Sequence, residues 1–557
     1  MRARYSGILL AAAMVTIAMF AIACGAAATA TPAPTSAPAP TAATAATPTA
    51  VPTARPAPTA TQAPQADKPV RGGTIRFPLS LSIDPPDPAY TTQTGTRNVL
   101  LAVFDNLTEF TPTGPISPGL ARSWEFSNDG KTITFRLAPN VTFTDGTKLD
   151  AAAVKWNFDR YLDAKVGSPR KGDVSPPLTS VEVVDSTTVR FQLSAPFRPL
   201  LAALTQQAGA IVSPTAVQKY NSYSDRTGDF GRFPVGSGPF KLKEWIPGTR
   251  FSFVRNENYW QSGLPYADAI EMPIIGDQQI QFAMLRTGEV DIMERLPTAV
   301  VDIAQRNPDV KLVDLPGVST QVVTFRVTAK PFDNKLLRQA LAWAVDRDAV
   351  GKVVFGGRAQ PAQSLISPAD GPWYDPTIQV YKRDVAKAKA LLAQAGFPSG
   401  FTFNMICRTG GSDGQTCEVL QASLAEAGIT MNIQLYDNVT YYTDFVAKKM
   451  DGPLASFYSA RPDPGINIRR LYHSKSPQNA FGYANAQVDQ MIDDVDTIYD
   501  VAQAKLVYSK ILTALADEGP MIYLSWWNTT FGLRNNVRNF TTVSDALLRF
   551  RDVWLAK

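Results

Sequence analysis

The feature that most restricts the fold of this chain is a long segment near its N-terminus that contains almost nothing to bury. From Ala26 to Pro69 the sequence is mainly Ala, Thr and Pro, with no aromatic residue and with Val51 as its only large aliphatic residue. Apolar burial cannot offset the entropy of ordering such a segment, so we expect it to stay disordered. Its prolines favour extended polyproline II geometry, which predicts a semi-rigid spacer before a folded body that begins near Arg71.

The residues before this spacer have the order of an export signal. Arg2 and Arg4 precede an apolar run, Ile8 to Ala23, which ends in small residues beside Cys24. The run is shorter than the roughly 20 residues that comfortably span a bilayer. The order resembles a bacterial lipoprotein signal, in which the Cys becomes the first residue and carries lipid. Ala21 stands where that signal usually has Leu.

We therefore expect the protein to be anchored in the cell membrane and to face the extracytoplasmic space, either periplasm or cell exterior. Residues 1–23 are then a lipoprotein signal peptide, and residues 24–70 are the lipidated Cys24 with its tether. Each buried CH2 of an acyl chain contributes about 0.8 kcal/mol, so two or three chains hold firmly. An ordinary signal peptide with an incidental cysteine, or an uncleaved anchor, stays open as the alternative.

Composition restricts the function of the body. The chain is 45% hydrophobic and 18% charged, and its 54 basic and 49 acidic residues leave a net charge of +5, which argues against a nucleic-acid surface. A single histidine argues against His-based triads and His-rich zinc sites. No phosphate-binding or dinucleotide-binding fingerprint occurs. We expect no catalytic site, no metal site and no cofactor.

Two cysteines remain besides Cys24. Cys407 and Cys417 flank a Gly-rich stretch, CRTGGSDGQTC, that is flexible enough to bring them together. Because exported proteins keep disulfides, we predict a disulfide between them, with two buried free thiols as the alternative.

Local patterns predict an α/β body in which hairpins come early and helices late. SWEFSNDGKTITFRL has the alternation and the turn residues of a hairpin. DAIEMPIIGDQQIQFAMLRTGEVDIM has the pattern strand, helix, strand, which favours an α/β sheet. Helical spacing predicts a helix that Asp150 caps and a second, strong helix that Asp333 caps.

Eight segments, in this order, resemble those of the extracytoplasmic solute-binding proteins of the peptide/nickel class, which serve ABC importers. They are GGTIRFPLSLSIDPPDP, LARSWEFSNDGKTITFRL, VTFTDGTKLDAAAVKWNF, VGSGPFKLKEW, RNENYW, LRTGEVDIM, RQALAWAVDRDAV and AKALLAQAGF. The resemblance implies a two-lobed type II periplasmic-binding-protein fold with an additional subdomain. It further implies a monomer that holds a peptide or similar small organic solute between hinged lobes and delivers it to permease subunits.

The resemblance also divides the body into lobes. Lobe I is expected from residues 71–105, 235–312 and 522–557. Its extra subdomain is expected over residues 106–234, and lobe II over residues 313–521.

Ligand contacts are carried over from the family by local position only. They are Tyr90, Thr92 and Thr94 after DPAY, Gln321 in GVSTQVVTF, Arg408 before GGSDG, Phe457, Tyr458 and Arg461 in SFYSARPDP, and Trp526 or Trp527 in YLSWWN. Since successive strand residues face opposite sides, we expect one of the two tryptophans to belong to the core.

Two departures from the family pattern concern the charge of the ligand. Ala460 stands where peptide-binding members often place the Asp that pairs with the peptide ammonium group, and Arg326 stands where they often have Asn. Guanidinium groups suit carboxylate or phosphate. We therefore hypothesise that Arg461, with Arg408 or Arg326, meets an anionic ligand. The alternative is that these arginines pair with acidic neighbours; a bare nickel ion is not expected.

Two other functions stay open for such a chain. One is an extracellular sensor or receptor of the same fold without a transporter. The other is a secreted hydrolase, which would need clustered acids, or a nucleophile with a base, in the nominated segments.

Overall fold

The computed structural model describes residues 68–557, apart from 80–82, 92, 111–115, 175–176, 226, 379–380, 410, 438–439, 442–443, 445–448, 451, 460, 462, 477 and 542–546. The predicted signal, Cys24 and the tether lie outside the described residues. Asp67–Lys557 form one compact unit. Within the described part of that unit, no helix combines the length and the apolar character needed to cross a membrane.

The first sheet joins the start of the described chain to a hairpin far along the sequence. Its order is β1 (Thr74–Arg76), β10 (Ala269–Pro273), β9 (Arg250–Arg255) and β8 (Phe240–Ile246), with β1 parallel to β10. Helix α1 (Thr94–Val103) and residues near the C-terminus share its apolar core, in which Phe77 packs against Phe550 at 5.5 Å.

A second sheet, β4–β5–β7–β6, is antiparallel and stands between the parts of the first along the chain. Its strands are β4 (Ala121–Phe126), β5 (Thr132–Leu137), β6 (Leu178–Asp185) and β7 (Thr188–Leu193), and α2 (Ala151–Leu162) covers one face. The predicted β4–β5 hairpin is confirmed, as is the cap of α2, where Asp150 accepts from the Ala153 amide at 3.0 Å. The small sheet β2 (Thr108–Phe110) and β3 (Ile116–Pro118) lies nearby in the chain.

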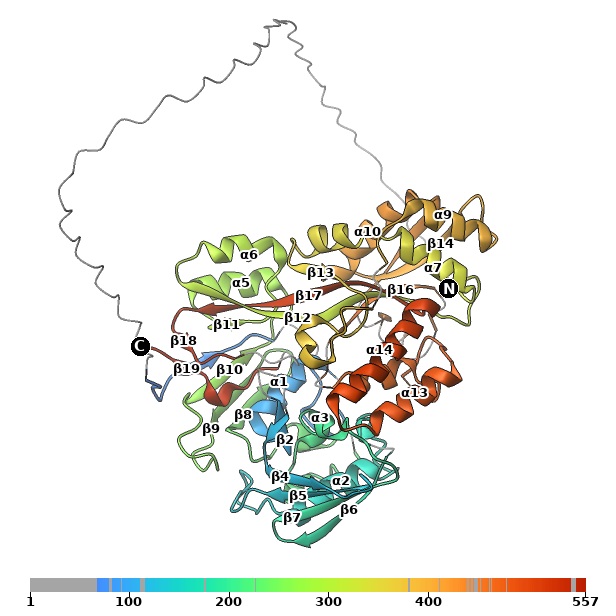
Figure 1. Cartoon of the computed structure of the whole chain (residues 1–557). Helices are drawn as coiled ribbons and strands as arrows, with labels where there is room; N and C mark the ends of the chain where they lie inside the picture. Colours follow the sequence, from blue (N-terminus) through green and yellow to red (C-terminus); the bar gives the residue numbers. More distant parts are fainter. Residues whose placement is uncertain are drawn as a thin grey trace, which may run out of the picture. The chain divides into compact units, whose positions relative to one another are not determined.

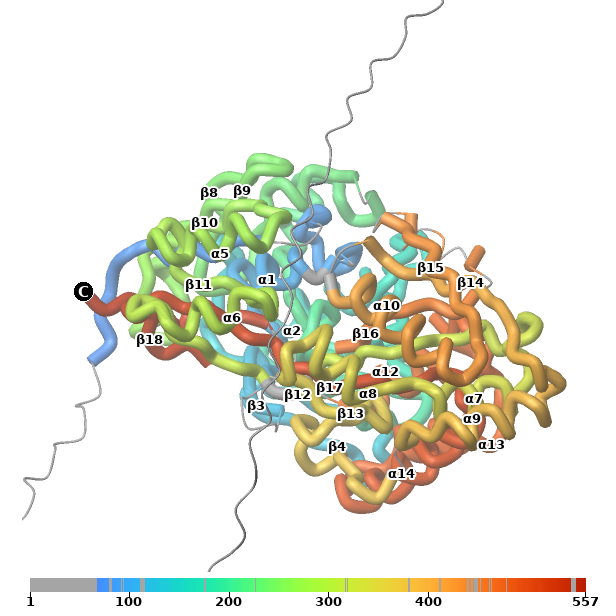
Figure 2. Tube along the Cα trace, turned by 90° about the horizontal axis from the view of Figure 1, so that it is seen from above, coloured from blue at the N-terminus to red at the C-terminus, as the bar shows by residue number. Residues whose placement is uncertain are grey.

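The third sheet contains two long strands that determine where the candidate site lies. β12 (Val310–Thr324) and β17 (Met521–Arg534) pair antiparallel, with an irregularity between Leu315 and Ser319. The order is β11 (Ile292–Met293), β17, β12, β16 (Leu454–Ser459), β14 (Phe401–Arg408) and β15 (Ile429–Tyr436), with β13 (Ala359–Pro361) also on β17. Figure 2 shows α5 (Gln278–Thr287) and α6 (Thr298–Gln305) beside one end of these long strands and α7 (Lys335–Ala344), α9 (Val385–Gln394) and α10 (Gly411–Ala425) beside the other.

The helices cover both faces of the third sheet. One core packs α7, α9 and α10 on it, and another packs α12, α13 and α14 on the opposite face. Asn334, rather than the predicted Asp333, caps α7, because its side chain accepts from the Leu336 amide at 3.0 Å. The remaining bounds are α3 (Leu200–Ala203), α4 (Pro214–Lys219), α8 (Arg347–Ala349), α12 (Pro464–Tyr472), α13 (Ala486–Asp496), α14 (Val501–Glu518), β18 (Val537–Arg538) and β19 (Trp554–Leu555).

The division into lobes stays a prediction. The strands of the β4–β5–β7–β6 sheet all lie inside the range 106–234 that is predicted for the extra subdomain. β12 begins at Val310 and passes the predicted boundary at 312 without a break.

Candidate functional site

The candidate site lies where β12, β16 and β17 run side by side. Trp527 and Ser459 both pair with Ser319, whereas Trp526 and Tyr458 both pair with Thr320. Because side chains alternate across a strand, these two rows face opposite sides of the sheet.

Trp527 lies on the side of the sheet that carries Phe355 and Phe457. Its ring stacks on Phe355, with centroids 5.4 Å apart, and meets the ring of Phe457 at 5.9 Å and near a right angle. The indole N–H of Trp527 is buried and has no hydrogen-bond acceptor among the described residues. A buried donor without a partner costs about 1–3 kcal/mol, so this N–H is suited to a ligand acceptor.

Trp526 is the core member of the pair. It is 4% exposed and lies among the side chains of α12, α13 and α14. Its indole N–H donates to the Ser364 carbonyl at 2.9 Å. The expectation that one tryptophan belongs to the core therefore applies to Trp526, and Trp527 is the one left as a candidate ligand contact.

A buried carboxylate that the sequence did not single out joins two of the predicted residues. The Nε2 of Gln321 donates to the Oδ1 of Asp413 at 2.7 Å, and Arg408 forms an ion pair with the same carboxylate. The guanidinium of Arg408 also lies over the rings of Phe457 and Tyr441, 5.2 Å from each centroid. Arg408 is therefore already neutralised, so the alternative of an acidic neighbour holds for it. The GGSDG motif, which marked Arg408, contains Asp413 itself.

A disulfide fixes this part of the site. Cys407 and Cys417 are bonded, with Cα atoms 6.5 Å apart, and the bond joins the end of β14 to α10. Arg408 and Asp413 lie between the two cysteines in the sequence, so the bond constrains the segment that carries their ion pair.

Arg326 lies two residues beyond the end of β12, where the Val327 amide donates to the Phe481 carbonyl at 3.0 Å. Five extended residues separate it from Gln321, which corresponds to roughly 16 Å. The predicted role of Arg326 in anion binding stays a prediction.

Of the three ligand contacts predicted after DPAY, only Tyr90 has a side chain that the structure describes. Tyr90 is 5% exposed, packs in the core of the β4–β5–β7–β6 sheet and lies under Arg160, whose guanidinium is 5.4 Å from its ring centroid. Burial raises the pKa of Tyr90. Thr92 lies outside the described residues, and Thr94 begins α1, where its side chain is not described.

Arg461 and Tyr458 belong to a second group of polar residues on the chain leaving β16. The Nη1 of Arg461 donates to the Oε1 of Gln206 at 3.5 Å, and the guanidinium of Arg470 lies 5.9 Å from the ring centroid of Tyr458. Burial and then the nearby charges of Arg97 and Arg470 lower the pKa of Arg461 well below its ordinary value. The sequence patterns singled out neither Arg97, Arg470 nor Gln206, because no motif marks them.

Asp463, at the start of α12, is engaged in structure. It caps α12 by accepting from the Gly465 amide at 2.8 Å, and it forms an ion pair with Arg198. Both partners are buried, and Asp463 is therefore unavailable to a ligand ammonium group.

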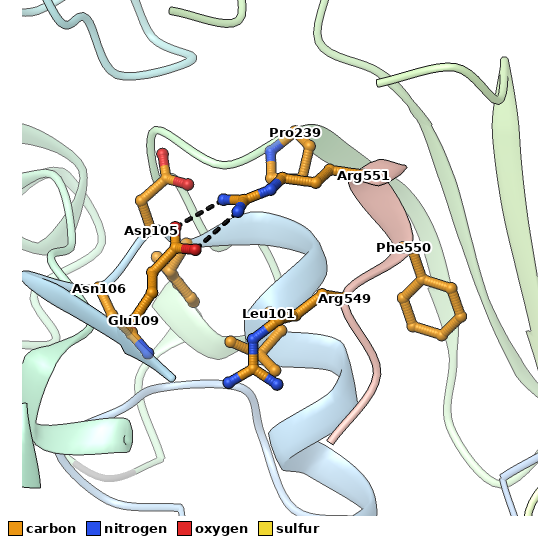
Figure 3. Close-up of a pocket in the computed structure, with 9 residues that line it drawn as sticks. Leu101, Asp105, Asn106, Glu109, Pro239, Arg549, Phe550 and Arg551 are labelled. Carbon is orange, nitrogen blue, oxygen red and sulfur yellow. Dashed lines mark hydrogen bonds and ion pairs between the residues drawn. The ribbon is translucent and has the colours of Figure 1, made fainter. Parts of the chain in front are cut away.

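A small cavity between α1 and the C-terminal segment does not coincide with the predicted site (Figure 3). The guanidinium of Arg551 donates two hydrogen bonds to the carboxylate of Glu109 there, of 2.5 and 2.6 Å. Asp105 accepts from Ser237, Tyr259 and Trp260 at 2.9, 2.9 and 2.7 Å, and burial raises its pKa to about 6. Arg551 and Glu109 neutralise each other, and Asp105 is held by three neutral donors, so these groups form a structural network.

Among the described residues, no three or more His, Cys, Asp and Glu side chains gather in a way that could hold a metal ion. The candidate site instead presents aromatic rings, amide groups and guanidinium groups.

This combination of mixed α/β sheets and a candidate site on the long strands defines the class. The fold is that of a type II periplasmic binding protein, and solved structures match it over nearly their full length. DppA from Helicobacter pylori, solved with the peptide STSA, is 26% identical with a TM-score of 0.79 over 88% of this chain and 99% of that one. AgaA from A. tumefaciens R10, solved with agropinic acid, is 26% identical with a TM-score of 0.77 over 87% and 99%.

The chain belongs to the bacterial extracellular solute-binding proteins, family 5, whose model matches residues 115–479. The glutathione-binding protein GsiB of Escherichia coli (strain K12) is 29% identical over 443 residues, which are 78% of this chain and 85% of that protein. The protein is thus a substrate-binding component for ABC import. Its family is one of binding proteins, not of enzymes.

Proposed function

We propose that this protein is a membrane-anchored receptor that captures a peptide or similar small organic solute at the crossing of β12, β16 and β17. The observation that carries the proposal is the buried, unpartnered indole N–H of Trp527 beside two aromatic rings. The rings of Trp527, Phe355 and Phe457 form an apolar wall. One hydrogen-bond donor in such a wall can orient a solute that packs against it. The ligands of similar proteins, a peptide, agropinic acid and glutathione, are all small organic solutes.

Capture requires no bond to be made or broken in the solute. The ion pair of Arg408 with Asp413 and the amide of Gln321 hold the wall in place, because each of these buried polar groups satisfies another. A preformed wall costs little ordering when the solute binds. The bound receptor then presents the solute to permease subunits, and it acts as a monomer.

The tether supports the same role. Lipid at Cys24 would hold the protein at the membrane, and the Ala/Thr/Pro-rich spacer would let the folded body reach solute and permease alike. Replacing Cys24 with Ser is expected to release the protein from washed membranes into the soluble fraction. Retention of Cys24→Ser in the membrane would instead favour an uncleaved anchor.

The direct test is to identify what the purified full-length protein holds. Native mass spectrometry should show a bound small molecule that denaturation releases unchanged. Trp527→Phe keeps an aromatic ring and removes the N–H, so we expect about a tenfold loss of affinity for that molecule. Trp343→Phe, on α7, is the control and should leave affinity unchanged. A cleaved product, or equal affinity for Trp527→Phe, would overturn the proposal.

An extracellular sensor of the same fold is the second candidate. It is separated by uptake: deletion of the gene should abolish import of the identified solute, and the Cys24 variant should reduce it. Import that is unaffected by deletion would favour the sensor.

A further inference from the structure

Four arginines from distant parts of the chain converge beside the end of β16. They are Arg97 on α1, Arg170 before the short helical turn Lys171–Asp173, Arg461 between β16 and α12, and Arg470 on α12. Burial lowers the pKa of Arg461 and of Arg470, and the positive charges of neighbouring arginines lower both further. The cluster is therefore a concentration of positive charge, assembled by folding.

Hydrogen bonds through one amide join two of the four guanidiniums, because the Oε1 of Gln206 accepts from both Arg97 and Arg461. Asp173 is the one carboxylate among them: it is 3.4 Å from Arg170, and its charge also acts on Arg461 and Arg470. Arg470 is further held by Asn467, whose Oδ1 accepts from it at 3.0 Å.

The carboxylates named in this part of the protein already form ion pairs with arginines. Among the described residues, the charges that act most strongly on Arg461 are those of the other three arginines and of one carboxylate, Asp173. Asp463, only two residues from Arg461, is paired with Arg198. Asp87 on the nearby loop is paired with Arg160 at 2.7 Å. The cluster thus carries more positive than negative charge.

Several guanidinium N–H groups of the cluster have no hydrogen-bond acceptor in the described part of the protein. The Nε atoms of Arg170, Arg461 and Arg470 are buried, and none has an acceptor there. Buried charges in proteins are normally paired and hydrogen-bonded, because removing them from water is expensive. Three such donors on three guanidiniums indicate that an anion completes the site.

We propose that this arginine cluster binds the acidic end of the transported solute, and that the solute carries at least two carboxylates, because four guanidiniums are balanced by only one carboxylate, Asp173. This inference rests on the proposed function, and it specifies the substrate class. Planar guanidiniums bind carboxylates through two parallel hydrogen bonds, and an excess of three positive charges suits two anionic groups better than one. Tyr458 places the cluster at the end of β16, on the face of the sheet opposite to Phe457 and the aromatic wall.

The first arm of the test measures which probes the full-length protein binds after bound solute has been removed. We would titrate glutarate, tricarballylate and glutathione, and compare glutathione with its diester, which has no free carboxylate. Binding of at least one di- or tricarboxylate is expected, with at least a tenfold loss for the diester when glutathione binds. Failure of all three acids, binding of inorganic phosphate instead, or equal binding of the diester would overturn the inference.

The second arm uses Arg461→Gln and Arg470→Gln. Each should weaken carboxylate binding at least tenfold and yet raise the melting temperature of the ligand-free protein by about 2 °C, because like-charge repulsion is relieved. A merely structural arginine would lower that temperature when replaced. The matched control is Arg469→Gln on the same helix, which is paired with Asp493 and Asp496. It should lower the melting temperature and leave binding unchanged.

The two proposals fail separately. If the protein binds an uncharged solute, and Trp527→Phe weakens that binding while Arg461→Gln does not, the receptor function stands and the carboxylate inference falls. If Arg461→Gln lowers the melting temperature and leaves carboxylate affinity unchanged, the cluster is structural and the inference falls as well.

Discussion

Asp105 shows how burial and hydrogen bonding compete at a single carboxyl group. Three donors, Ser237, Tyr259 and Trp260, reach it, yet desolvation dominates and raises its pKa to about 6. An acid whose pKa is raised by folding binds its proton more tightly in the folded state than in the unfolded state. Between about pH 4 and pH 6 the folded state therefore holds more protons, and stability falls as the pH rises through this window.

We therefore expect Asp105→Asn to change how stability depends on pH. Relative to this variant, the natural protein should lose about 2–3 kcal/mol of unfolding free energy between pH 4 and pH 7, since each unit of pKa shift corresponds to about 1.4 kcal/mol. Denaturant unfolding at both pH values measures it. Asp129→Asn is the control, because hydrogen bonds lower the pKa of that exposed acid and its effect has the opposite sign. A difference between natural protein and Asp105→Asn that does not change with pH would contradict the prediction.

At the same scale, the sequence predicted the candidate site only where local pattern carries the information. Strand alternation predicted that one of two adjacent tryptophans belongs to the core, but only the contact of Trp526 with Ser364 shows which. Arg461 was nominated by the family motif around it. Arg97 and Arg170 were not, because they reach the cluster from about three hundred residues away and no local pattern encodes that approach.

Among the structural elements, α10 and β14 depend on a covalent link. The Cys407–Cys417 disulfide closes a loop over a sequence separation of 10 residues. On the chain-entropy estimate, closing a loop of this length contributes about 2–3 kcal/mol by restricting the unfolded state.

Replacing both cysteines with Ser should therefore lower the unfolding free energy by about 2–3 kcal/mol. Because the bond brackets Arg408 and Asp413, the double variant should also weaken solute binding. Denaturant titration and calorimetry measure the two effects, and reduction of the natural protein should reproduce both. Unchanged stability in the double variant would show that packing alone holds α10 on β14.

Elements were predictable where their signals are local. The β4–β5 hairpin follows from alternating Ile133 and Phe135 and from Gly130, which adopts a φ of 67° in the turn. The cap of α7 was misplaced by one residue, because Asp333 and Asn334 are both good capping residues and only the backbone decides between them. No local sequence pattern predicted that β12 continues unbroken from Val310 to Thr324.

For the whole molecule, the order of the motifs along the chain indicated the family more clearly than any single motif did. Eight short segments in one order predicted the solute-binding family, and the family model confirms it over residues 115–479. How the β4–β5–β7–β6 sheet meets the helices of the third sheet was not predictable, since the contacts join residues hundreds of positions apart. Three of them are the ring contact of Phe126 with Tyr499 at 4.4 Å, the hydrogen bond from the Tyr499 hydroxyl to the Gly130 carbonyl at 3.4 Å, and the ion pair of Arg198 with Asp463.

Arg198 is the one charged contact of these three, and its ion pair is buried on both sides. It follows β7, and its guanidinium reaches across to Asp463 at the start of α12 and lies 4.7 Å from the ring centroid of Trp373. Its backbone amide also donates to the Asp496 carbonyl at 2.7 Å. Because both charges are buried, removing one leaves the other without compensation.

Arg198→Ala should therefore cost about 3–5 kcal/mol of unfolding free energy and should loosen the contact between these parts. Small-angle scattering of the ligand-free variant should give a larger radius of gyration, and solute should reverse the increase because it bridges residues on both sides. Arg190→Ala, a half-exposed arginine on β7 next to Glu182, is the control and should change neither property. Since Asp463 also caps α12, Asp463→Asn keeps the cap and tests the ion pair alone. If Asp463→Asn leaves both the radius and the stability unchanged, the pair does not hold the two parts together, and the aromatic contact of Phe126 with Tyr499 becomes the next one to remove.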